Sequence, residues 1–417
     1  MNWSREKRRE IASWCLFDFA NSSFTTVVIT VIYARYFTTR VADDQGHLWS
    51  LALAVSNAVI IVSGPIVGAV ADRRALKKRL LFASYLVCVL CTAGLFLPTR
   101  GDGSTAFVLF VVANVAFSTG ENLIAAFLPE IAEPKEIGKV SGMGWATGYA
   151  GGLLALLACL PLAQSGSDLT LRSTNLVVAG FFLLGGIPTF LFVRERKRKP
   201  GTPGANAKRP GAFAEVRRTW TRRAQFPELF RFLTAYLIFS IGVYGVIQFA
   251  SILAEDFSLS PAETIPPLIA AQVTAAVGAM TVGRGMARFG AVGFIRMSLL
   301  MWIACGAVAL FAGGAAGFWI LAILAGGALG ATMASARATV ALFTPPDRSG
   351  EIFGFWGLYG RLAAILAPLG NWALLTVSGG SKRAGVLYFT LSFVLGYVLL
   401  RRVDERTGRE RATHPVN

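Results

Sequence analysis

Long apolar runs separated by short polar stretches make up most of this chain of 417 residues. A helix that crosses a hydrocarbon core of about 30 Å needs about 20 apolar residues. The runs are continuously apolar, whereas the strands of a membrane barrel alternate with a period of two. We therefore expect an all-α membrane protein with twelve transmembrane helices, at residues 11–37, 48–70, 79–98, 105–128, 140–164, 174–193, 229–254, 263–287, 291–312, 316–341, 351–377 and 385–400.

The composition supports this class, and the basic residues predict an orientation. The chain is 54% hydrophobic and 15% charged, with a mean hydropathy of +0.57, whereas soluble domains are about a quarter charged. The net charge of +17 is also found in nucleic-acid-binding proteins, but here the basic residues form short clusters between apolar runs, so no nucleic-acid partner is expected. Only five of the 40 basic residues lie in the loops on one side, which places both termini in the cytoplasm: Arg40, Arg100, Arg172, Lys382 and Arg383.

A basic, polar interruption divides the predicted helices six and six. We expect an N-terminal six-helix bundle at 1–193, a basic cytoplasmic linker at 194–228, a C-terminal six-helix bundle at 229–400 and a cytoplasmic tail at 401–417. The second part of the interruption mixes aromatic residues with arginines, and it is either a surface helix on anionic lipid or a solvated linker. No cleavable signal peptide is evident, because the first apolar run, at about 24 residues, exceeds a signal core.

The two halves resemble copies of each other at an offset of 215 residues. GAVADRRA at 68–75 matches GRGMARFG at 283–290, and EIGKVSG at 136–142 matches EIFGFWG at 351–357. Two parallel six-helix repeats are the simplest explanation of this match.

The cysteines and histidines do not predict a metal site, a disulfide or an enzyme. Cys88 and Cys91 form a CxxC inside an apolar helix, where small packing residues are the ordinary reading. The chain has no GxxxxGK phosphate loop, HExxH or GxSxG motif. We expect no cofactor and no catalytic residues.

A GxxxDR motif lies between the second and third predicted helices, with Gly68, Asp72 and Arg73 at its fixed positions and Arg288 in the second copy. It resembles the signature loop of the major facilitator superfamily, although Ala75 stands where that signature usually has Gly. The resemblance implies a conformational latch, in which Asp72 caps a helix end or pairs with a basic residue in one state. The alternative is a helix-ending loop within a basic cluster. Ala287 replaces the acid in the second copy, so its latch is expected to be weak or absent.

Longer motifs resemble a narrower group, the vacuole effluxer family, whose eukaryotic members are autophagy-related vacuolar amino-acid exporters. The motifs that carry the resemblance are WCLFDFANSSF at 14–24, FLPEIAEP at 127–134, VSGMGWATGYAGG at 140–152 and FGFWGLYGR at 353–361. The resemblance covers most of the chain and implies efflux of amino acids.

Two acids lie inside predicted helices, where a charge costs about 2.5–3.5 kcal/mol on insertion scales. Asp18 shares a helix face with Asn21; it either binds a proton or cationic group, or fixes helix one to the Gly-rich fifth helix. Glu121, beside Asn122, either carries protons and contacts substrate or pairs with a buried Arg for stability.

Cationic and aromatic residues complete the candidate site. Arg337 and Arg361 either hold a substrate carboxylate or form gating pairs near the cytoplasmic ends of their helices. A stripe in the seventh helix either lines a cavity or makes interhelical hydrogen bonds: Tyr236, Ser240, Tyr244 and Gln248. Tyr149 and Tyr359 are candidates for aromatic walls of the same cavity.

These features predict a monomeric secondary active transporter in the cytoplasmic (inner) membrane, moving a small zwitterionic solute by proton-coupled efflux. The partners we expect are the small-molecule substrate, protons and membrane lipids. The alternatives are an exporter of amphipathic compounds, such as a drug, siderophore or lipid, and, from other classes, a membrane-embedded enzyme or a non-transporting receptor.

Overall fold

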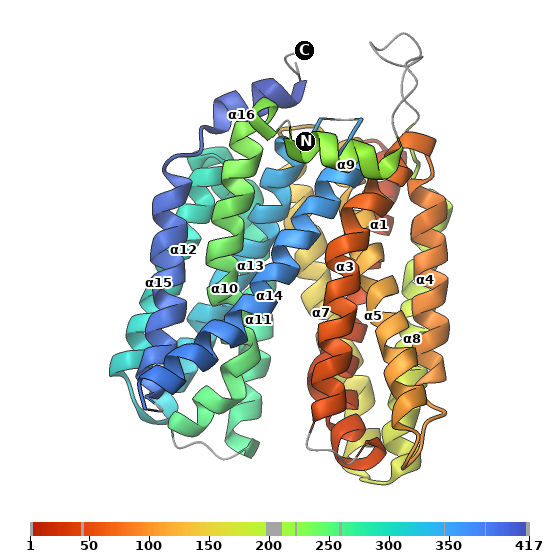
Figure 1. Ribbon diagram of the computed structural model, residues 1–417, viewed down its shortest axis with the longest axis vertical. Coiled ribbons are helices and arrows are strands. Elements are labelled where there is room, and N and C mark those ends of the chain that lie inside the picture. The colour runs from red at the N-terminus through yellow and green to blue at the C-terminus, as the bar shows by residue number, and fades with distance from the viewer. Residues whose placement is uncertain are drawn as a thin grey trace. The chain divides into compact units, whose positions relative to one another are not determined.

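The computed structural model describes residues 3–42, 46–196, 211–221, 223–257, 261–345, 347–379 and 381–413, and these are helical with no strand among them (Figure 1). The helices are α1 (Arg5–Ser23), η1 (Phe24–Val31), α2 (Tyr33–Tyr36), η2 (Phe37–Val41), α3 (His47–Arg74), α4 (Lys77–Gly94), α5 (Gly103–Ala125), α6 (Leu128–Ile131), α7 (Ile137–Gln164), α8 (Asp168–Phe192), α9 (Ala212–Thr221), η3 (Arg223–Gln225), α10 (Pro227–Asp256), α11 (Pro261–Phe289), α12 (Ala291–Phe311), α13 (Gly314–Leu342), α14 (Ser349–Val377), α15 (Lys382–Leu400) and α16 (Glu405–Thr413).

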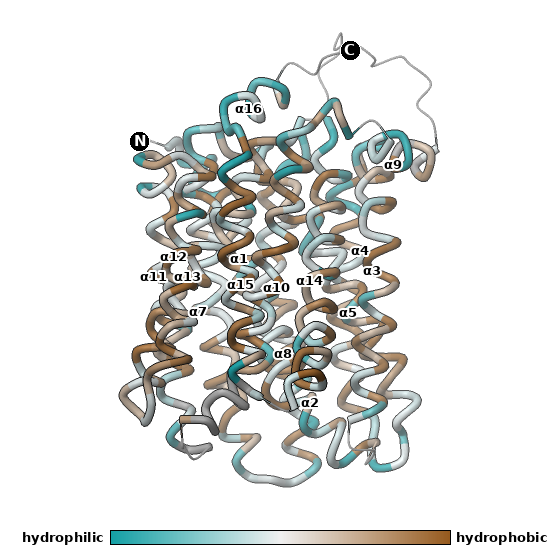
Figure 2. Tube along the Cα trace, turned by 60° about the vertical axis from the view of Figure 1, so that its left-hand side comes forward, coloured by the Kyte–Doolittle hydropathy of each residue, from teal (hydrophilic) through white to brown (hydrophobic). Residues whose placement is uncertain are grey.

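Within the described ranges, 11 helices are long and apolar enough to cross a membrane. Each coincides with a predicted span, and Figure 2 shows hydrophobic stretches along the long helices. The remaining predicted span, 79–98, is α4, whose 18 residues begin with Lys77, Lys78 and Arg79. These three charges lower the mean hydropathy of α4, which is why it is not among the 11 helices, although the rest of the helix is apolar. The multi-pass membrane class predicted from the sequence is confirmed.

The first span, Arg5–Val41, changes its hydrogen-bonding pattern along its length. Residues 24–31 and 37–41 form π-helical turns, in which Ile32 N donates to Val27 O at 2.9 Å and Ala42 N to Phe37 O at 2.9 Å. The sequence predicted one regular helix over 11–37. A wider turn shifts the register of the side chains that follow it, and such turns occur frequently at functional sites.

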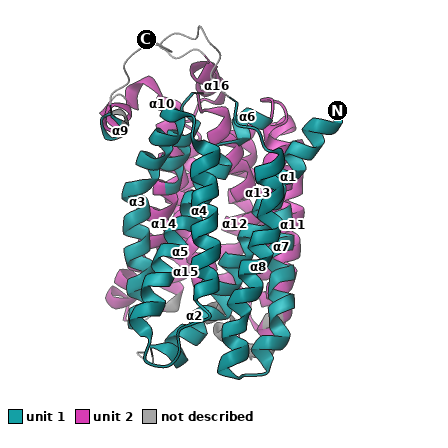
Figure 3. Cartoon of the chain, turned by 90° about the vertical axis from the view of Figure 1, so that its right-hand side faces the viewer, with its two compact units in different colours: residues 1–131, 147–216, 347–357 teal, residues 132–146, 217–346, 358–417 magenta. Residues whose placement is uncertain are grey.

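The contacts divide the chain into two compact units, shown in Figure 3, and each unit includes a short helical segment distant in sequence. Unit 1 comprises 1–131, 147–216 and 347–357; unit 2 comprises 132–146, 217–346 and 358–417. The sequence-based division at 194–228 stays a prediction, and residues 197–210 and 222 of that predicted linker lie outside the described residues.

In unit 1, α1 packs against α8, and α5 packs against α3 and α4. An aromatic cluster fills this core, with Phe17 in T-shaped contact with Phe182 at 5.7 Å and Phe190 at 6.5 Å between ring centroids. Three glycines of α7 allow α1 to approach closely: a Cβ on Gly151 would lie 2.0 Å from Phe19 O, and Gly148 and Gly152 contact the same helix. Close packing through small residues is characteristic of membrane helices.

In unit 2, α11 packs against α13, α10 against α15, and α12 against α13 and α15. Trp302 of α12 stacks on Phe393 of α15 at 5.0 Å between ring centroids, and its indole N–H donates to Thr332 Oγ1 at 3.1 Å. After α15, the tail turns back and forms α16, whose Glu405 accepts a hydrogen bond from Val292 N at 3.0 Å. The carboxylate thereby caps the N-terminus of α12.

The α1–α7 contact gives a test of this packing. We expect Gly151→Ala to destabilise the protein by about 1–3 kcal/mol, because the new methyl group would overlap the carbonyl of Phe19. Gly180→Ala in α8 is the matched control, since a Cβ there meets nothing within 4 Å and alanine favours the helix. Thermal unfolding in detergent measures both variants, and equal midpoints would contradict the contact.

Candidate functional site

The carboxylate of Asp72, at the end of α3, holds the N-terminus of α14. Its two oxygens accept hydrogen bonds from the backbone N–H groups of Gly350 at 2.9 Å and Glu351 at 2.8 Å. The first N–H groups of a helix have no partner within the helix and carry a partial positive charge, so an anion there is stabilising. Asp72 therefore joins a helix of the first half of the sequence to one of the second half.

Lys77, at the start of α4, connects this cap to two further groups. Its Nζ lies 3.4 Å from Asp72 Oδ1, donates to Ser349 Oγ at 2.8 Å and forms an ion pair with Glu130. The side chains of Asp72, Lys77 and Glu130 are only 5%, 7% and 8% exposed. Because a buried charge that loses its partner is strongly destabilising, this network holds α3, α4, α6 and the start of α14 together.

The residues that follow α8 extend the network. The carboxylate of Glu195 accepts from Lys77 N at 2.9 Å and Lys78 N at 3.2 Å, so it caps α4. Arg196 N donates to Glu130 Oε2 at 3.0 Å, and its guanidinium donates to Glu10 at 3.2 Å. The first residues of the predicted linker are thus fixed to three helices of unit 1, α1, α4 and α6.

Glycines bring the backbones of α3 and α14 into direct contact. A Cβ on Gly68 would lie 2.0 Å from Gly350 O, and one on Gly350 would lie 2.6 Å from Gly68 O. One turn away, a Cβ on Gly354 would lie 2.5 Å from Gly64 O. Two GxxxG motifs, 64–68 and 350–354, therefore face each other, and larger residues would separate the helices.

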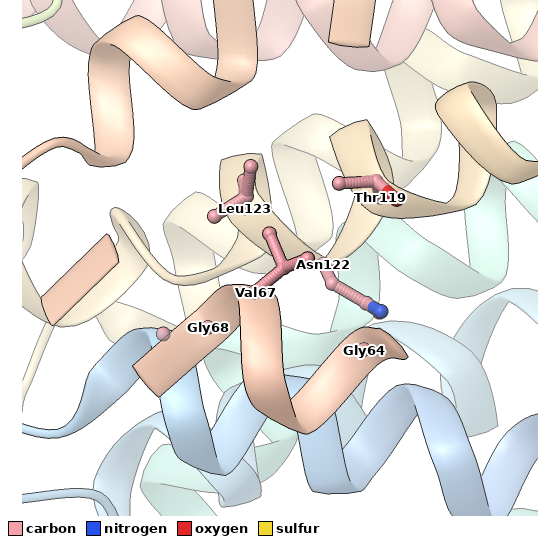
Figure 4. Close-up of a pocket in the computed structure, with 7 residues that line it drawn as sticks. Gly64, Val67, Gly68, Thr119, Asn122 and Leu123 are labelled. Atoms are coloured by element: carbon pink, nitrogen blue, oxygen red, sulfur yellow. The ribbon is translucent and has the colours of Figure 1, made fainter. Parts of the chain in front are cut away.

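Beside this contact lies a small cavity of about 10 Å³, lined by Gly64, Val67, Gly68, Thr119, Asn122, Leu123 and Gly350 (Figure 4). A cavity of this volume holds about one water molecule, so it is not a solute site. The side chain of Asn122 lies against Gly357 of α14, where a Cβ would be 2.4 Å from its amide atoms.

Unit 2 contains a second helix contact that corresponds to the first at the offset of 215 residues. Gly142 of α7 lies against α11, with a Cβ there 2.3 Å from Ala279 O, and a Cβ on Gly283 would lie 2.9 Å from Lys139 Cα. Ala287 occupies the position equivalent to Asp72 and is exposed. Arg288 is exposed, with its guanidinium 5.2 Å from the ring centroid of Phe289. The second contact therefore lacks the carboxylate cap.

Arg337 of α13 is anchored to α7 within unit 2. It is 4% exposed; its Nε donates to Ser141 Oγ at 3.2 Å and a terminal nitrogen donates to Ser141 O at 2.9 Å. The guanidinium also lies 5.5 Å from the ring centroid of Trp145. These bonds fix the orientation of a buried cation, whichever of its two predicted roles it has.

The α10 stripe faces α14 in unit 2. The hydroxyls of Tyr236 and Tyr244 both lie near Gly360, at 3.2 and 3.5 Å from the position of a Cβ there. Gln248 Nε2 donates to Ala364 O at 3.2 Å. The structure thus brings three predicted residues beside Tyr359, which is 8% exposed, and the half-buried Arg361.

The remaining predicted residues belong to unit 1. Asp18 is half-buried, and its carbonyl oxygen accepts from Ser22 Oγ at 2.9 Å beside Gly148 of α7. Asn21 is 5% exposed, and its Oδ1 has no hydrogen-bond partner among the described residues. Glu121 and Tyr149 are half-buried. Arg73 is exposed, next to Asp72 but outside the network of Asp72, Lys77 and Glu130 that the described residues form.

The sequence did not single out Glu130, Glu195 or Ser349. Glu130 lies inside the motif at 127–134, so the motif marked the segment without showing its partner. Glu195 and Ser349 stand in polar stretches, where acids and hydroxyls are common. Only their contacts across long sequence separations reveal the role of these residues.

The all-helical membrane architecture and the GxxxDR motif are those of a major facilitator superfamily transporter, a class that is not enzymatic. The chain belongs to the family described as "vacuole effluxer Atg22 like", whose sequence profile matches residues 48–413. The resemblance found from the motifs is thereby confirmed.

Individual relatives agree with this class. The chain is 27% identical to the uncharacterized MFS-type transporter YxiO of Bacillus subtilis, over 95% of each protein. Its fold resembles the human organic anion transporter MFSD10 (TM-score 0.71, 14% identity, 95% of this chain and 100% of that chain). It also resembles the transporter FucP of E. coli (TM-score 0.71, 14% identity, 96% and 100%).

The glycine contact makes a prediction about access to the cavity. We expect Gly68→Ala to displace the start of α14, because its methyl group would overlap Gly350 O. A cysteine introduced at Val67 should then react about tenfold faster with a membrane-impermeant maleimide. The reason is that about 1.4 kcal/mol of destabilisation raises tenfold the population of molecules in which the α3–α14 contact is open. Gly94→Ala is the control, because its Cβ meets only the flexible side chain of Leu109; equal rates would contradict the prediction.

The departure from the superfamily signature at Ala75 makes another prediction. Ala75 ends α3 in the left-handed region with φ +49°, a conformation that costs a non-glycine residue about 1 kcal/mol. Ala75→Gly should therefore raise the free energy of unfolding by about 1 kcal/mol. Thermal unfolding measures the change, and a lower midpoint than that of the parent protein would show the expectation to be wrong.

Proposed function

We propose that this transporter moves an amino acid or another small zwitterionic metabolite by alternating access, with efflux coupled to protons. The single observation that carries the proposal is the bond between Asp72 and the N-terminus of α14. Alternating access needs a contact between the two repeats that forms in one state and breaks in the other. A capped helix end, with Lys77 as counter-ion, is a contact of this kind.

Residues inside the spans supply the chemistry of the proposal. Glu121 carries the coupling proton, because a carboxyl group away from bulk water can exist in a charged and a neutral form. Arg337 and Arg361 bind the carboxylate of a substrate, since a guanidinium offers two parallel N–H donors. Asp18 and Asn21 supply further polar groups, and the tyrosines Tyr149, Tyr236, Tyr244 and Tyr359 provide aromatic surface with hydroxyl groups.

The arrangement in the membrane follows the same proposal. Twelve helices, with α4 as the third, place both termini in the cytoplasm and the protein in the inner membrane as a monomer. Support for proton coupling comes from the fold: two solved structures that resemble the chain are named a fucose:proton symporter and a proton:xylose symporter. Efflux follows from the name of the family.

Transport by purified protein in liposomes tests the function. We expect liposomes containing the protein to exchange radiolabelled amino acids from a mixed pool, and an imposed pH gradient to drive their accumulation. Asp72→Asn should slow the exchange, because a neutral side chain holds the helix end and Lys77 less strongly. Flux of hydrophobic cations or lysolipids without flux of amino acids would replace this proposal with export of amphipathic compounds.

The role of Glu121 has its own test. Glu121→Gln should abolish accumulation driven by the pH gradient while leaving exchange of substrate between the two sides, because exchange needs no net proton movement. Glu133→Gln is the matched control, since it removes a carboxylate whose side chain is 57% exposed. Accumulation by the Glu121→Gln variant at the rate of the parent protein would remove Glu121 from the coupling mechanism.

A further inference from the structure

The short helix α9 presents aromatic and basic side chains that the transport cycle does not use. Phe213 is 70% exposed and Trp220 is 46% exposed, and Arg217 and Arg218 are exposed beside them. Phe213, Arg217 and Trp220 are spaced by four and three residues, so they share one helix face. Thr219, on another face, is 2% exposed. The exposed side of this helix therefore carries large apolar side chains together with arginines.

Its position is fixed by the helix that follows. The 3-10 turn η3 lies between α9 and α10 in sequence, and Trp220 contacts Phe230 edge-on at 6.1 Å between ring centroids. Phe230 is the fourth residue of α10, and residues 227–249 are long and apolar enough to cross a membrane. Trp220 thus lies at the level of the first turn of a membrane helix, where tryptophan is enriched at the boundary with water.

The direction of α9 and its charge identify what covers this face. Figure 1 shows α9 running across the direction of α10, as a helix lying in the plane of a bilayer surface does. Arg223, with its guanidinium 5.6 Å from the ring centroid of Trp220, adds a third exposed cation beside Arg217 and Arg218. Cations next to apolar side chains at this depth fit anionic headgroups above acyl chains.

We propose that α9 is an interfacial anchor that binds the anionic lipid surface of the leaflet at which α10 begins. Phe213 and Trp220 enter the boundary of the acyl chains, and Arg217, Arg218 and Arg223 contact phosphate groups. This interaction fixes the C-terminal end of the basic linker to the membrane. It depends on lipid charge and not on the transported solute, so it stands independently of the proposed substrate.

A fluorescent label on α9 tests the proposal. Phe213→Cys is labelled with bimane in a Cys91→Ser background, since the other four cysteines are buried, and the protein is placed in nanodiscs of POPC alone or of equal parts POPC and POPG. With POPG we expect emission at shorter wavelength and stronger quenching by a lipid spin-labelled near its headgroup. Added salt should reduce both effects, because it screens exposed charges.

Two double variants separate α9 from general charge effects. Arg217→Gln with Arg218→Gln should lower the POPG-dependent quenching by about half or more, because two of the three proposed phosphate contacts are removed. Arg5→Gln with Arg8→Gln is the matched control, since it removes two exposed charges from α1 and should leave the quenching unchanged. Emission and quenching that are the same with and without POPG, as for a face covered by protein or water, would overturn the proposal.

Discussion

The contact between α3 and the start of α14 constrains the rest of unit 1. Its backbones touch at Gly68 and Gly350, and Asp72 accepts the first N–H groups of α14. Neither feature is sufficient alone: without glycines the carboxylate could not reach the helix end, and without the carboxylate the end of α14 would be buried with unsatisfied donors. Lys77 then balances the buried charge, which also brings Glu130 and α6 to the same point.

The two helix contacts related by the offset of 215 residues use similar backbone geometry with different chemistry. In both, glycines of a GxxxG-like stretch allow a helix from the other half of the sequence to approach, at Gly68 in one and at Gly283 in the other. Only the first has an acid at the helix end, because Ala287 stands at the equivalent position. The first contact holds a buried carboxylate and two helix donors, whereas beside the second, next to Gly142, the buried cation Arg337 is bonded to Ser141 of α7. The two related contacts are therefore held by charged side chains of opposite sign, Asp72 at the first and Arg337 at the second.

The ends of helices carry most of the polar structure that surrounds the spans. Glu195 caps α4 and Glu405 caps α12, each from the segment that follows the last helix of its predicted bundle. Because both caps come from outside the spans, the start of the linker and the tail are part of the folded protein. Helix α9 lies between them in sequence, so the segments outside the predicted bundles contribute to stability, and in our proposal also to membrane contact.

The amino-acid sequence by itself determined the multi-pass membrane class and the family and predicted two repeats, because apolar length, internal similarity and long mixed motifs are properties of consecutive residues. It also marked Asp72 as a latch residue, but it could not show that the partner is the backbone of Gly350, 278 residues away. Hydrogen bonds to backbone N–H groups carry no side-chain signature. The tertiary structure alone therefore decided which glycines touch, that Lys77 links Asp72 to Glu130, and that Arg337 is held by Ser141.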